Sequence, residues 1–210
     1  MRIDLHIHTK PLSPDSTMDV EEAIQEAKKI GVDGLCLTEH NRVWKAEVIK
    51  DLRKKWDFLL LRGIEVETFE GHILAFGLFR DFESIIRLDE LRNLVDREEG
   101  MLAAAHPFKG FLVFGGSVKL GLTPEKASQR PVFRKVDLIE GFSGRLSESE
   151  NTLAQEVGKM LGLKCTGGSD AHSLKNIGKC VTIFEKKIDN EADLVTELKA
   201  GRFHAAHFRT

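Results

Sequence analysis

Short apolar runs alternate along this chain with longer amphipathic stretches, and this alternation restricts the possible folds more than any other feature. The predicted strands cover residues 2–8, 33–38, 58–66, 72–77, 101–105, 136–140, 163–166, 180–184 and 203–208. The predicted helices between them cover residues 19–31, 43–55, 85–100, 147–161 and 190–200. Two of these helices begin with a capping box, in which Asp19 pairs with Glu22 and Ser147 with Glu150. Repeated strand–helix alternation predicts an α/β fold built on a parallel sheet.

Length and charge exclude several classes of protein. The chain has 210 residues, which at roughly 150 residues per domain predicts one domain over 1–210. Its 31 Lys and Arg residues against 33 Asp and Glu residues give a net charge of −2, so binding to long nucleic acid through bulk charge is not expected. No apolar run is long enough to span a membrane, and the first residues lack the pattern of a signal peptide. We therefore expect a cytoplasmic protein.

The cysteines do not suggest a structural zinc site. Cys36, Cys165 and Cys180 are odd in number, form no CxxC pair and lie in or beside apolar stretches. They are expected to be small buried side chains in a reducing compartment.

The histidines gather at the ends of predicted strands. Five of the first six lie at or just beyond the C-terminal end of a strand, namely His6, His8, His40, His106 and His172, whereas His72 opens a strand. Glu65, Glu140 and Asp170 follow the same rule. In a parallel α/β barrel those strand ends meet on one face, where active sites lie. His204 and His207, near the C-terminus, are expected to be packing or surface residues.

Two short motifs within this set are ambiguous when each is taken alone. His6 and His8 are alternate residues of one strand and so face the same side, with Ile3, Leu5 and Ile7 expected on the other. Such a pair also occurs on surface strands. Asp170-Ala171-His172 follows two glycines and would equally suit a capped turn.

The complete set points to a metal cluster. Nine potential ligands come from separate strand–helix units: His6, His8, Asp15, His40, Glu65, His72, His106, Asp170 and His172. Burying so many polar groups without partners would cost on the order of 1–3 kcal/mol each, and a shared cluster of ions removes that cost. Imidazole and carboxylate donors suit Zn, Fe or Mn.

Five motifs, in this order, carry a resemblance to a known family. They are Asp4-Leu5-His6-Ile7-His8-Thr9, Thr38-Glu39-His40-Asn41, Gly63-Ile64-Glu65-Val66, Ala105-His106-Pro107 and Gly168-Ser169-Asp170-Ala171-His172. From about residue 2 to 185 the chain resembles the polymerase-and-histidinol-phosphatase (PHP) family of metal-dependent phosphoesterases. The resemblance implies a distorted seven-stranded, TIM-like (βα) barrel with its active site at the C-terminal ends of the strands.

The resemblance also implies two or three divalent metal ions (Mn, Fe or Zn), in a trinuclear site when all three are present. One ion would be bound by His6, His8, Glu65 and Asp170, and a second would share Glu65 and be bound by His72 and His106. A third would be bound by Asp15, His40 and His172, although Asp15 would also suit a turn or a helix cap. Glu140 lies where relatives often carry Glu-Val-x-Asn, and here it is a possible supporting group rather than a ligand.

Several further residues receive provisional interpretations. Glu39 is expected to pair with a helix or to cap backbone groups, and Glu67 and Glu70 are expected to be solvated. Substrate-binding cations are sought near the motifs, and the candidates are Lys10, Lys109, Arg130, Arg134 and Arg145. The Gly-rich segment 108–131 is expected to form a lid, a binding loop or an inserted helix. Its Phe108–Phe114 stretch would supply aromatic faces for a nucleobase or would only pack.

The function expected from these features is hydrolysis of a phosphomonoester of a small metabolite or nucleotide. A metal-bridging hydroxide would be the nucleophile. Asp15, His172 or water would supply the proton to the leaving group. Three alternatives remain open: a nuclease or 3′,5′-nucleoside bisphosphate phosphatase, an amidohydrolase-like enzyme that cleaves C–N bonds, and a non-catalytic metal-binding module.

Overall fold

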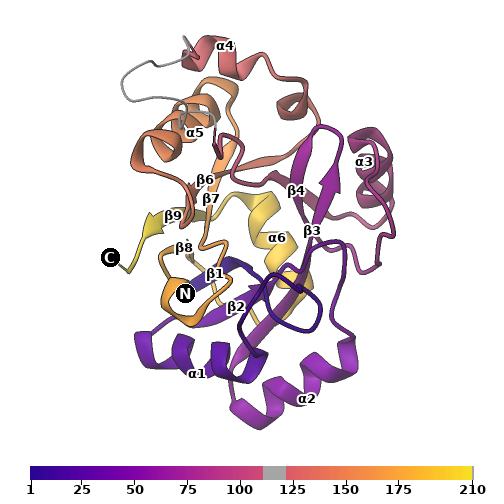
Figure 1. The fold of residues 1–210 in the computed structure, drawn as a ribbon, viewed down its shortest axis with the longest axis vertical. Coiled ribbons are helices and arrows are strands. Elements are labelled where there is room, and N and C mark those ends of the chain that lie inside the picture. Colours follow the sequence, from indigo (N-terminus) through magenta and orange to yellow (C-terminus); the bar gives the residue numbers. More distant parts are fainter. Residues whose placement is uncertain (111–121, 210) are drawn as a thin grey trace.

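The computed structural model describes residues 1–110 and 122–209, whose strands form one mixed sheet (Figure 1). The order of the nine strands is β7-β6-β5-β4-β3-β2-β1-β8-β9. The strands are β1 (Arg2–Ile7), β2 (Gly34–Leu37), β3 (Leu59–Thr68), β4 (Gly71–Phe76), β5 (Met101–Ala104), β6 (Leu138–Ser143), β7 (Lys164–Gly168), β8 (Cys180–Phe184) and β9 (Phe203–His207). The helices are α1 (Val20–Ile30), α2 (Ala46–Trp56), α3 (Leu88–Arg97), α4 (Pro124–Ser128), α5 (Glu148–Leu161) and α6 (Glu191–Ala200), with short 3-10 turns η1 (Pro131–Arg134) and η2 (Leu174–Asn176).

The sheet curls into a nearly closed barrel because the chain after β7 returns to β1. The N–H of Ala171 donates to the carbonyl of His6 over 3.3 Å, and the N–H of His8 donates to the carbonyl of Ala171 over 3.0 Å. The barrel-shaped α/β fold predicted from the sequence is confirmed. The predicted count of seven strands is not, because the described residues form nine.

The expectation of a wholly parallel sheet is wrong at two places. Strand β4 runs antiparallel to β3 and β5, and β8 runs antiparallel to β1 and β9. Only Phe69 and Glu70 separate β3 from β4. So short a connection joins antiparallel strands, since a parallel crossover needs a dozen residues or more.

Three apolar clusters fill the space around the sheet. One cluster draws on strands from all round the barrel and is completed by α6; it includes Leu5, Leu61, Leu74, Ala103, Leu194 and Leu198. The second packs α1 and α2 on the sheet, and the third packs α3 and α5. In Figure 1, α1 and α2 lie at one end of the molecule and α4 and α5 at the other. No helix in residues 1–110 and 122–209 has the length and apolar character that crossing a membrane requires.

An irregularity in β1 changes which residues share a face. Ile3 and Leu5 belong to the barrel cluster, whereas Ile7 packs with α1 and α2. The pairing register of β1 with β2 shifts between Asp4 and Ile7. The prediction that the three apolar residues lie on one side is therefore wrong, because a bulge interrupts the two-residue period.

The two helix starts predicted from capping boxes are confirmed, whereas α2 starts at Ala46 rather than at residue 43 and has no side-chain cap. The carboxylate of Asp19 accepts the N–H of Glu21 over 2.8 Å, and Glu22 accepts the N–H of Asp19 over 3.3 Å. Helix α5 begins with the same arrangement at Ser147 and Glu150. The third helix starts later than expected, at Leu88, because Ile86 bridges to Thr68 beside the β3–β4 hairpin.

The segment 108–131 contains an inserted helix, α4, and leads into η1. Phe108 is fully buried and packs near Phe133, with ring centroids 6.0 Å apart. It therefore offers no free aromatic face. Phe111 and Phe114 lie outside the described residues, so the nucleobase contact and the lid stay predictions for that part of the segment.

Candidate metal centre

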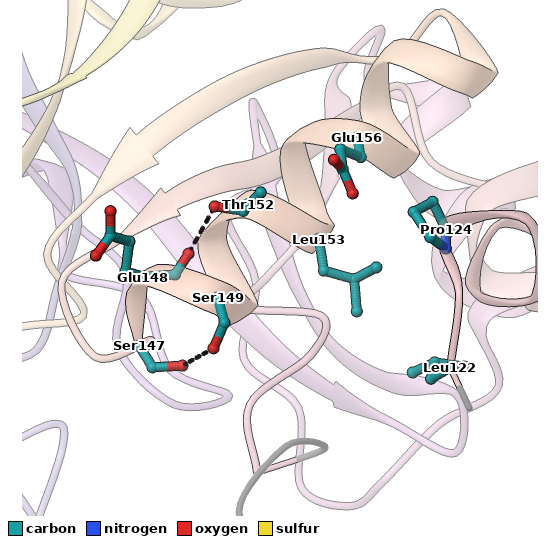
Figure 2. Close-up of a pocket in the computed structure, with 8 residues that line it drawn as sticks. All are labelled: Leu122, Pro124, Ser147, Glu148, Ser149, Thr152, Leu153 and Glu156. Atoms are coloured by element: carbon teal, nitrogen blue, oxygen red, sulfur yellow. Dashed lines mark hydrogen bonds between the residues drawn. The ribbon is translucent and has the colours of Figure 1, made fainter. Parts of the chain in front are cut away.

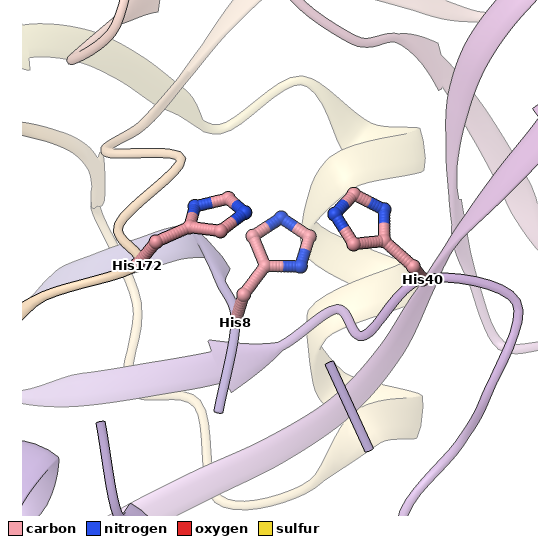
Figure 3. A group of neighbouring side chains, drawn as sticks. All are labelled: His8, His40 and His172. Atoms are coloured by element: carbon pink, nitrogen blue, oxygen red, sulfur yellow. The ribbon is translucent and has the colours of Figure 1, made fainter. Parts of the chain in front are cut away.

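The nine predicted ligands come together at one end of the barrel. His6 lies in β1 and His8 just beyond it, His40 follows β2, Glu65 lies in β3, and His72 lies in β4. His106 follows β5, Asp170 and His172 follow β7, and Asp15 precedes α1. Figure 3 shows the imidazoles of His8, His40 and His172 facing one another from three separate segments, with centroids of the first two 4.2 Å apart.

Glu65 lies at the centre of this cluster and is fully buried. Its two carboxylate oxygens face five imidazoles. The Oε2 atom lies 3.4 Å from His6 Nε2, 3.3 Å from His8 Nε2 and 3.0 Å from His40 Nδ1. The Oε1 atom lies 3.0 Å from His72 Nδ1 and 2.9 Å from His106 Nε2.

Two aspartates close the cluster on either side. Asp170 Oδ1 lies 3.4 Å from His8 Nε2 and 3.8 Å from His6 Nε2. Asp15 Oδ2 lies 2.9 Å from His172 Nε2 and 3.4 Å from His40 Nε2. The predicted distribution of individual ligands among three ions stays a prediction, since His8 also groups with His40 and His172.

The donor set fits divalent cations, as four of its atoms show. His6 Nε2, His8 Nε2, His40 Nδ1 and Glu65 Oε2 are buried and have no hydrogen-bond partner among the described residues. An unsatisfied buried polar atom costs about 1–3 kcal/mol. All four atoms point into the same cluster, and overlapping groups of three donor residues bring their ligand atoms within 4.8 Å of one another. Coordination of a cation would satisfy all four.

Supporting hydrogen bonds orient the imidazoles for this purpose. His6 Nδ1–H donates to Glu140 Oε1 over 2.9 Å, which leaves Nε2 as the bare nitrogen that faces Glu65. Glu140 Oε2 accepts the backbone N–H of His106 over 2.7 Å. Glu140 therefore supports two donors and lies behind the cluster.

The charges within the cluster shift the pKa values of His6 and Glu65 strongly. Burial opposes protonation of His6, but the carboxylates of Glu140, Glu65 and Asp170 outweigh it and hold the pKa of His6 well above its usual value. Burial would raise the pKa of Glu65, but the charge of His6, the hydrogen bond from His106 and the close contact with His40 hold it well below its usual value. Without cations, the histidines thus supply the positive charge that the carboxylates require.

The pKa directions of Asp15 and His172 bear on their predicted catalytic roles. Partial burial would raise the pKa of Asp15, but the charges of His172, His40 and His8 lower it. Burial and the charge of His8 lower the pKa of His172. At neutral pH Asp15 is therefore a carboxylate and His172 a neutral imidazole, which suits ligation or acceptance of a proton rather than donation.

Two of the predicted substrate-binding cations reach the cluster. Lys109 Nζ lies 3.0 Å from Asp170 Oδ2, and Arg145 Nε lies 3.8 Å from the same oxygen. A guanidinium nitrogen of Arg145 also lies 3.0 Å from His172 Nδ1. Both side chains are about two-fifths exposed, at 41% and 40%, so they stand between the donors and solvent.

A cleft of about 360 Å³ opens beside His72 and His106. Its walls include both histidines, Glu70, Lys109 and Arg130, and its apolar part includes Ala104, Ala105 and Val132. Glu70 is not simply solvated as predicted, because its carboxylate accepts the N–H of Leu88 over 3.0 Å and forms part of the wall. Lys10 and Arg134 are exposed and do not line this cleft.

A larger hollow of about 660 Å³ lies along the first turns of α5 (Figure 2). Its described lining includes Ser147, Ser149, Thr152 and Glu156, and none of the nine donors. Since this lining carries neither a histidine nor a cation, the smaller cleft beside the metal centre is the better candidate for substrate.

Sequence reasoning gave no role to Asp4 or Ser13 and gave Glu39 only a pairing or capping role, although all three organise the cluster. The fully buried carboxylate of Asp4 accepts the N–H groups of Ser169 and Gly178 over 2.8 and 2.9 Å. It thereby ties the loop that carries Asp170 and His172 to β1. Ser13 and Glu39 lie behind His8. The sequence signals were the positions of Asp4 beside the HxH motif and of Glu39 beside His40, and Ser13 gave none.

Comparison with known proteins finds similarity to PHP proteins. Residues 148–203 match a family model described as PHP-associated. Over 167 residues, 77% of this chain, the sequence is 23% identical to the PolC-type DNA polymerase III of Thermotoga maritima, of which it spans only 12%. A two-domain protein of Bacteroides vulgatus that contains a predicted PHP-like metal-dependent phosphoesterase has the same fold, with a TM-score of 0.65 and 19% identity. Together these similarities support the PHP family for this chain.

The extent of these similarities differs between relatives. The alignment with the Bacteroides protein covers 99% of this chain and 65% of that one. An uncharacterized protein of Methanocaldococcus jannaschii, MJ1587, is 29% identical over 117 residues, which are 51% of this chain and 68% of that protein. An amidohydrolase of Chromobacterium violaceum, solved with sulfate and no metal, matches 97% of both chains with a TM-score of 0.64 and 15% identity. At such low identity the structural likenesses concern the fold alone.

Proposed function

We propose that this PHP-family chain hydrolyses a phosphomonoester of a small metabolite or nucleotide at the donor cluster. The observation that carries the proposal is the convergence of Lys109 and Arg145 on Asp170, at the open side of the nine donors. A phosphoryl group presents several anionic oxygens, and ammonium and guanidinium groups bind them with strong charge-assisted hydrogen bonds. An amide substrate would not require two cations at this position.

In this proposal one set of residues binds metal ions and another orients the phosphoryl group. His6, His8, Glu65, Asp170 and the other donors would hold divalent Mn, Fe or Zn. When bound, such cations would supply Lewis acidity, which lowers the pKa of water and neutralises charge on phosphoryl oxygens. Lys109 and Arg145 would orient the phosphoryl group, and Asp15 or His172 would accept a proton, in keeping with their lowered pKa values.

One observation favours a second candidate, a nucleoside bisphosphate phosphatase. Lys109 and Arg130 both line the 360 Å³ cleft beside His72 and His106, so a second anionic group would meet positive charge there. The volume of the cleft suits a small molecule. If the enzyme of this second candidate were a nuclease instead, its substrate would be the end of a short oligonucleotide.

The test is phosphate release by protein reconstituted with Mn²⁺. A generic phosphomonoester, a 3′,5′-bisphosphonucleoside and a short single-stranded oligonucleotide would be compared side by side. Release from the monoester supports the leading proposal, and preference for the bisphosphate supports the second. Hydrolysis of none of the three by metal-loaded protein would contradict both.

The variant Lys109→Met tests whether the activity depends on the proposed site. Lys109→Met should lower kcat/KM about 10- to 100-fold, because a hydrogen bond to a charged group contributes about 1.5–3 kcal/mol. Lys126→Met is the control, since Lys126 is an exposed residue of α4 that lines neither hollow. Equal activity of the two variants would remove Lys109 from the site.

A further inference from the structure

Glu39 is a fully buried carboxylate outside the nine donors, and four hydrogen-bond donors point at it. Its Oε2 accepts the backbone N–H of Thr9 over 2.7 Å and the hydroxyl of Ser13 over 2.5 Å. Its Oε1 accepts the hydroxyl of Thr9 and, over 2.8 Å, the indole N–H of Trp44. With four donors around it, Glu39 uses both of its carboxylate oxygens as hydrogen-bond acceptors.

The hydroxyl of Ser13 joins this carboxylate to the metal centre. A serine hydroxyl has one proton, and here that proton is donated to Glu39. The oxygen of Ser13 must therefore accept from its other two neighbours. These are the backbone N–H of His40 at 3.2 Å and Nδ1 of His8 at 3.3 Å.

The direction of these hydrogen bonds decides the tautomer of His8. Since Ser13 accepts, the ring proton of neutral His8 lies on Nδ1, and Nε2 keeps its lone pair. That Nε2 lies 3.3 Å from Glu65 Oε2 and 3.4 Å from Asp170 Oδ1, and it has no hydrogen-bond partner among the described residues. A metal ligand needs this bare nitrogen.

We propose that Glu39 and Ser13 are positioning residues of the metal centre, in which Ser13 connects the buried carboxylate of Glu39 to His8 and fixes its metal-binding tautomer. The proposal rests on the metal centre proposed above and extends it to two residues that are not ligands. His6 is supported directly by the carboxylate of Glu140, whereas His8 is supported through a hydroxyl. The same hydroxyl fixes the backbone of His40, so one serine aligns two donors.

The test is Zn²⁺ affinity, measured by calorimetric titration of the full chain. Ser13→Ala and Glu39→Gln should each weaken binding about 10- to 100-fold, the usual effect of removing an outer partner of a metal ligand. In Glu39→Gln either orientation of the amide places its NH2 group against a fixed N–H donor, the backbone of Thr9 or the indole of Trp44, so the acceptor that orients the hydroxyl of Ser13 is disturbed. The double variant should bind no more weakly than the weaker single variant, because both act through one path.

Two further variants distinguish loss of the hydrogen bond to His8 from a general disturbance of the fold. Ser13→Thr keeps the hydroxyl and should restore most of the affinity. Ser143→Ala is the matched control, because Ser143 is buried and its hydroxyl has no hydrogen-bond partner among the described residues. Its Zn²⁺ affinity should equal that of the wild type.

A spectroscopic measurement on wild-type protein makes the proposal independent of how the variants fold. With histidine labelled by nitrogen-15, Zn²⁺-loaded protein should show a protected Nδ1–H proton on His8, and that protection should be lost in Ser13→Ala. The proposal would be overturned if the wild type lacked the protected proton. It would also be overturned by unchanged Zn²⁺ affinity in Ser13→Ala or by additive losses of affinity in the double variant. Failure of the wild type to bind Zn²⁺ would instead contradict the metal centre itself.

Discussion

The five imidazoles around Glu65 make this one carboxylate the residue on which the cluster depends most. Each of its two oxygens contacts more than one imidazole nitrogen, and Oε2 has no hydrogen-bond partner among the described residues. A carboxylate in that position can bridge neighbouring cations, which a neutral amide does poorly. The charge of Glu65, and not only its shape, should therefore be required.

Replacement of Glu65 by glutamine should abolish tight binding of Mn²⁺ or Zn²⁺ and lower phosphoesterase activity at least 100-fold. The fold should persist, since glutamine has nearly the same volume. Metal content by elemental analysis and kcat/KM are the measurements. Glu67→Gln is the matched control in the same strand, because Glu67 is only partly buried and belongs to none of the donor groups. Retention of metal by Glu65→Gln at wild-type affinity would contradict the cluster.

Metal affinity should rise with pH, because protons and cations compete for the same nitrogens. In the metal-free protein the pKa values of His6, His40 and His72 lie above the ordinary histidine value, since contacts with Glu65 and its neighbours stabilise the imidazolium forms. These groups stay protonated to higher pH than a free histidine and must lose protons when a cation binds. Affinity should thus increase through the range above about pH 6.5.

Calorimetry in two buffers of different ionisation enthalpy would measure the released protons directly. The expected result is a Zn²⁺ dissociation constant that falls from about pH 6 to about pH 8 together with net proton release. A dissociation constant that stays flat over this range would show that the ligands are already deprotonated, contrary to the raised pKa values.

The donors could be predicted from sequence because metal chemistry uses few residue types and strand ends bring them together. Ser13 and Glu39 could not be predicted as partners of His8. Their relation depends on a hydrogen bond between residues separated by 26 positions, and serine is too common to mark a site. Glu39 was expected to cap backbone groups and does accept the N–H of Thr9, but its bonds to three side chains appear only in the structure.

At the scale of elements, two glycines let the end of β7 pack closely, Gly168 against β1 and Gly167 against β8. A Cβ atom at Gly168 would lie 2.4 Å from Cβ of His6 and 2.9 Å from Oε1 of Glu140. A Cβ atom at Gly167 would instead lie 2.4 Å from the carbonyl oxygen of Val181 in β8. Both contacts are too short for real atoms, but only the first involves a donor and its supporting carboxylate.

Gly168→Ala and Gly167→Ala should therefore differ in their effect on the metal centre. Each should lower the free energy of unfolding by at least about 1–3 kcal/mol, the usual cost of overpacking. Only Gly168→Ala should also weaken Zn²⁺ binding, because it displaces His6 or Glu140. Denaturant unfolding and Zn²⁺ titration on the folded protein measure the two effects. Equal affinity in the two variants would mean that the approach of β7 does not position His6.

Element boundaries were predictable where local residues decide them. The capping boxes at Asp19 and Ser147 fix the starts of α1 and α5, and a left-handed glycine ends each of these helices. The direction of β4 was not predictable from its own apolar pattern, because the pattern is the same in parallel and antiparallel strands. The two-residue connection at Phe69-Glu70 was the informative signal.

At the scale of the whole molecule, the donors come from both ends of the chain. His6 and His8 belong to β1, whereas Asp170 and His172 follow β7, and the seam between these segments is held by the backbone bonds of Ala171. The donor cluster lies beside these bonds, with His6 and His8 on one side of the seam and Asp170 and His172 on the other. Cations bound there would connect the first and last thirds of the barrel.

Metal binding should therefore stabilise the entire fold and not just the site. A ligand that binds only the folded state adds about 2.7 kcal/mol at a free concentration of 100 Kd. For a domain of about 150–250 residues, each kcal/mol raises Tm by roughly 2–4 °C, so Zn²⁺ should raise Tm by about 5–10 °C relative to protein treated with a chelator. Scanning calorimetry with and without Zn²⁺ is the measurement, and Glu65→Gln, which lacks the central ligand, should show no such shift. A wild-type Tm that does not respond to verified metal loading would mean that the cations bind without joining the two ends of the barrel.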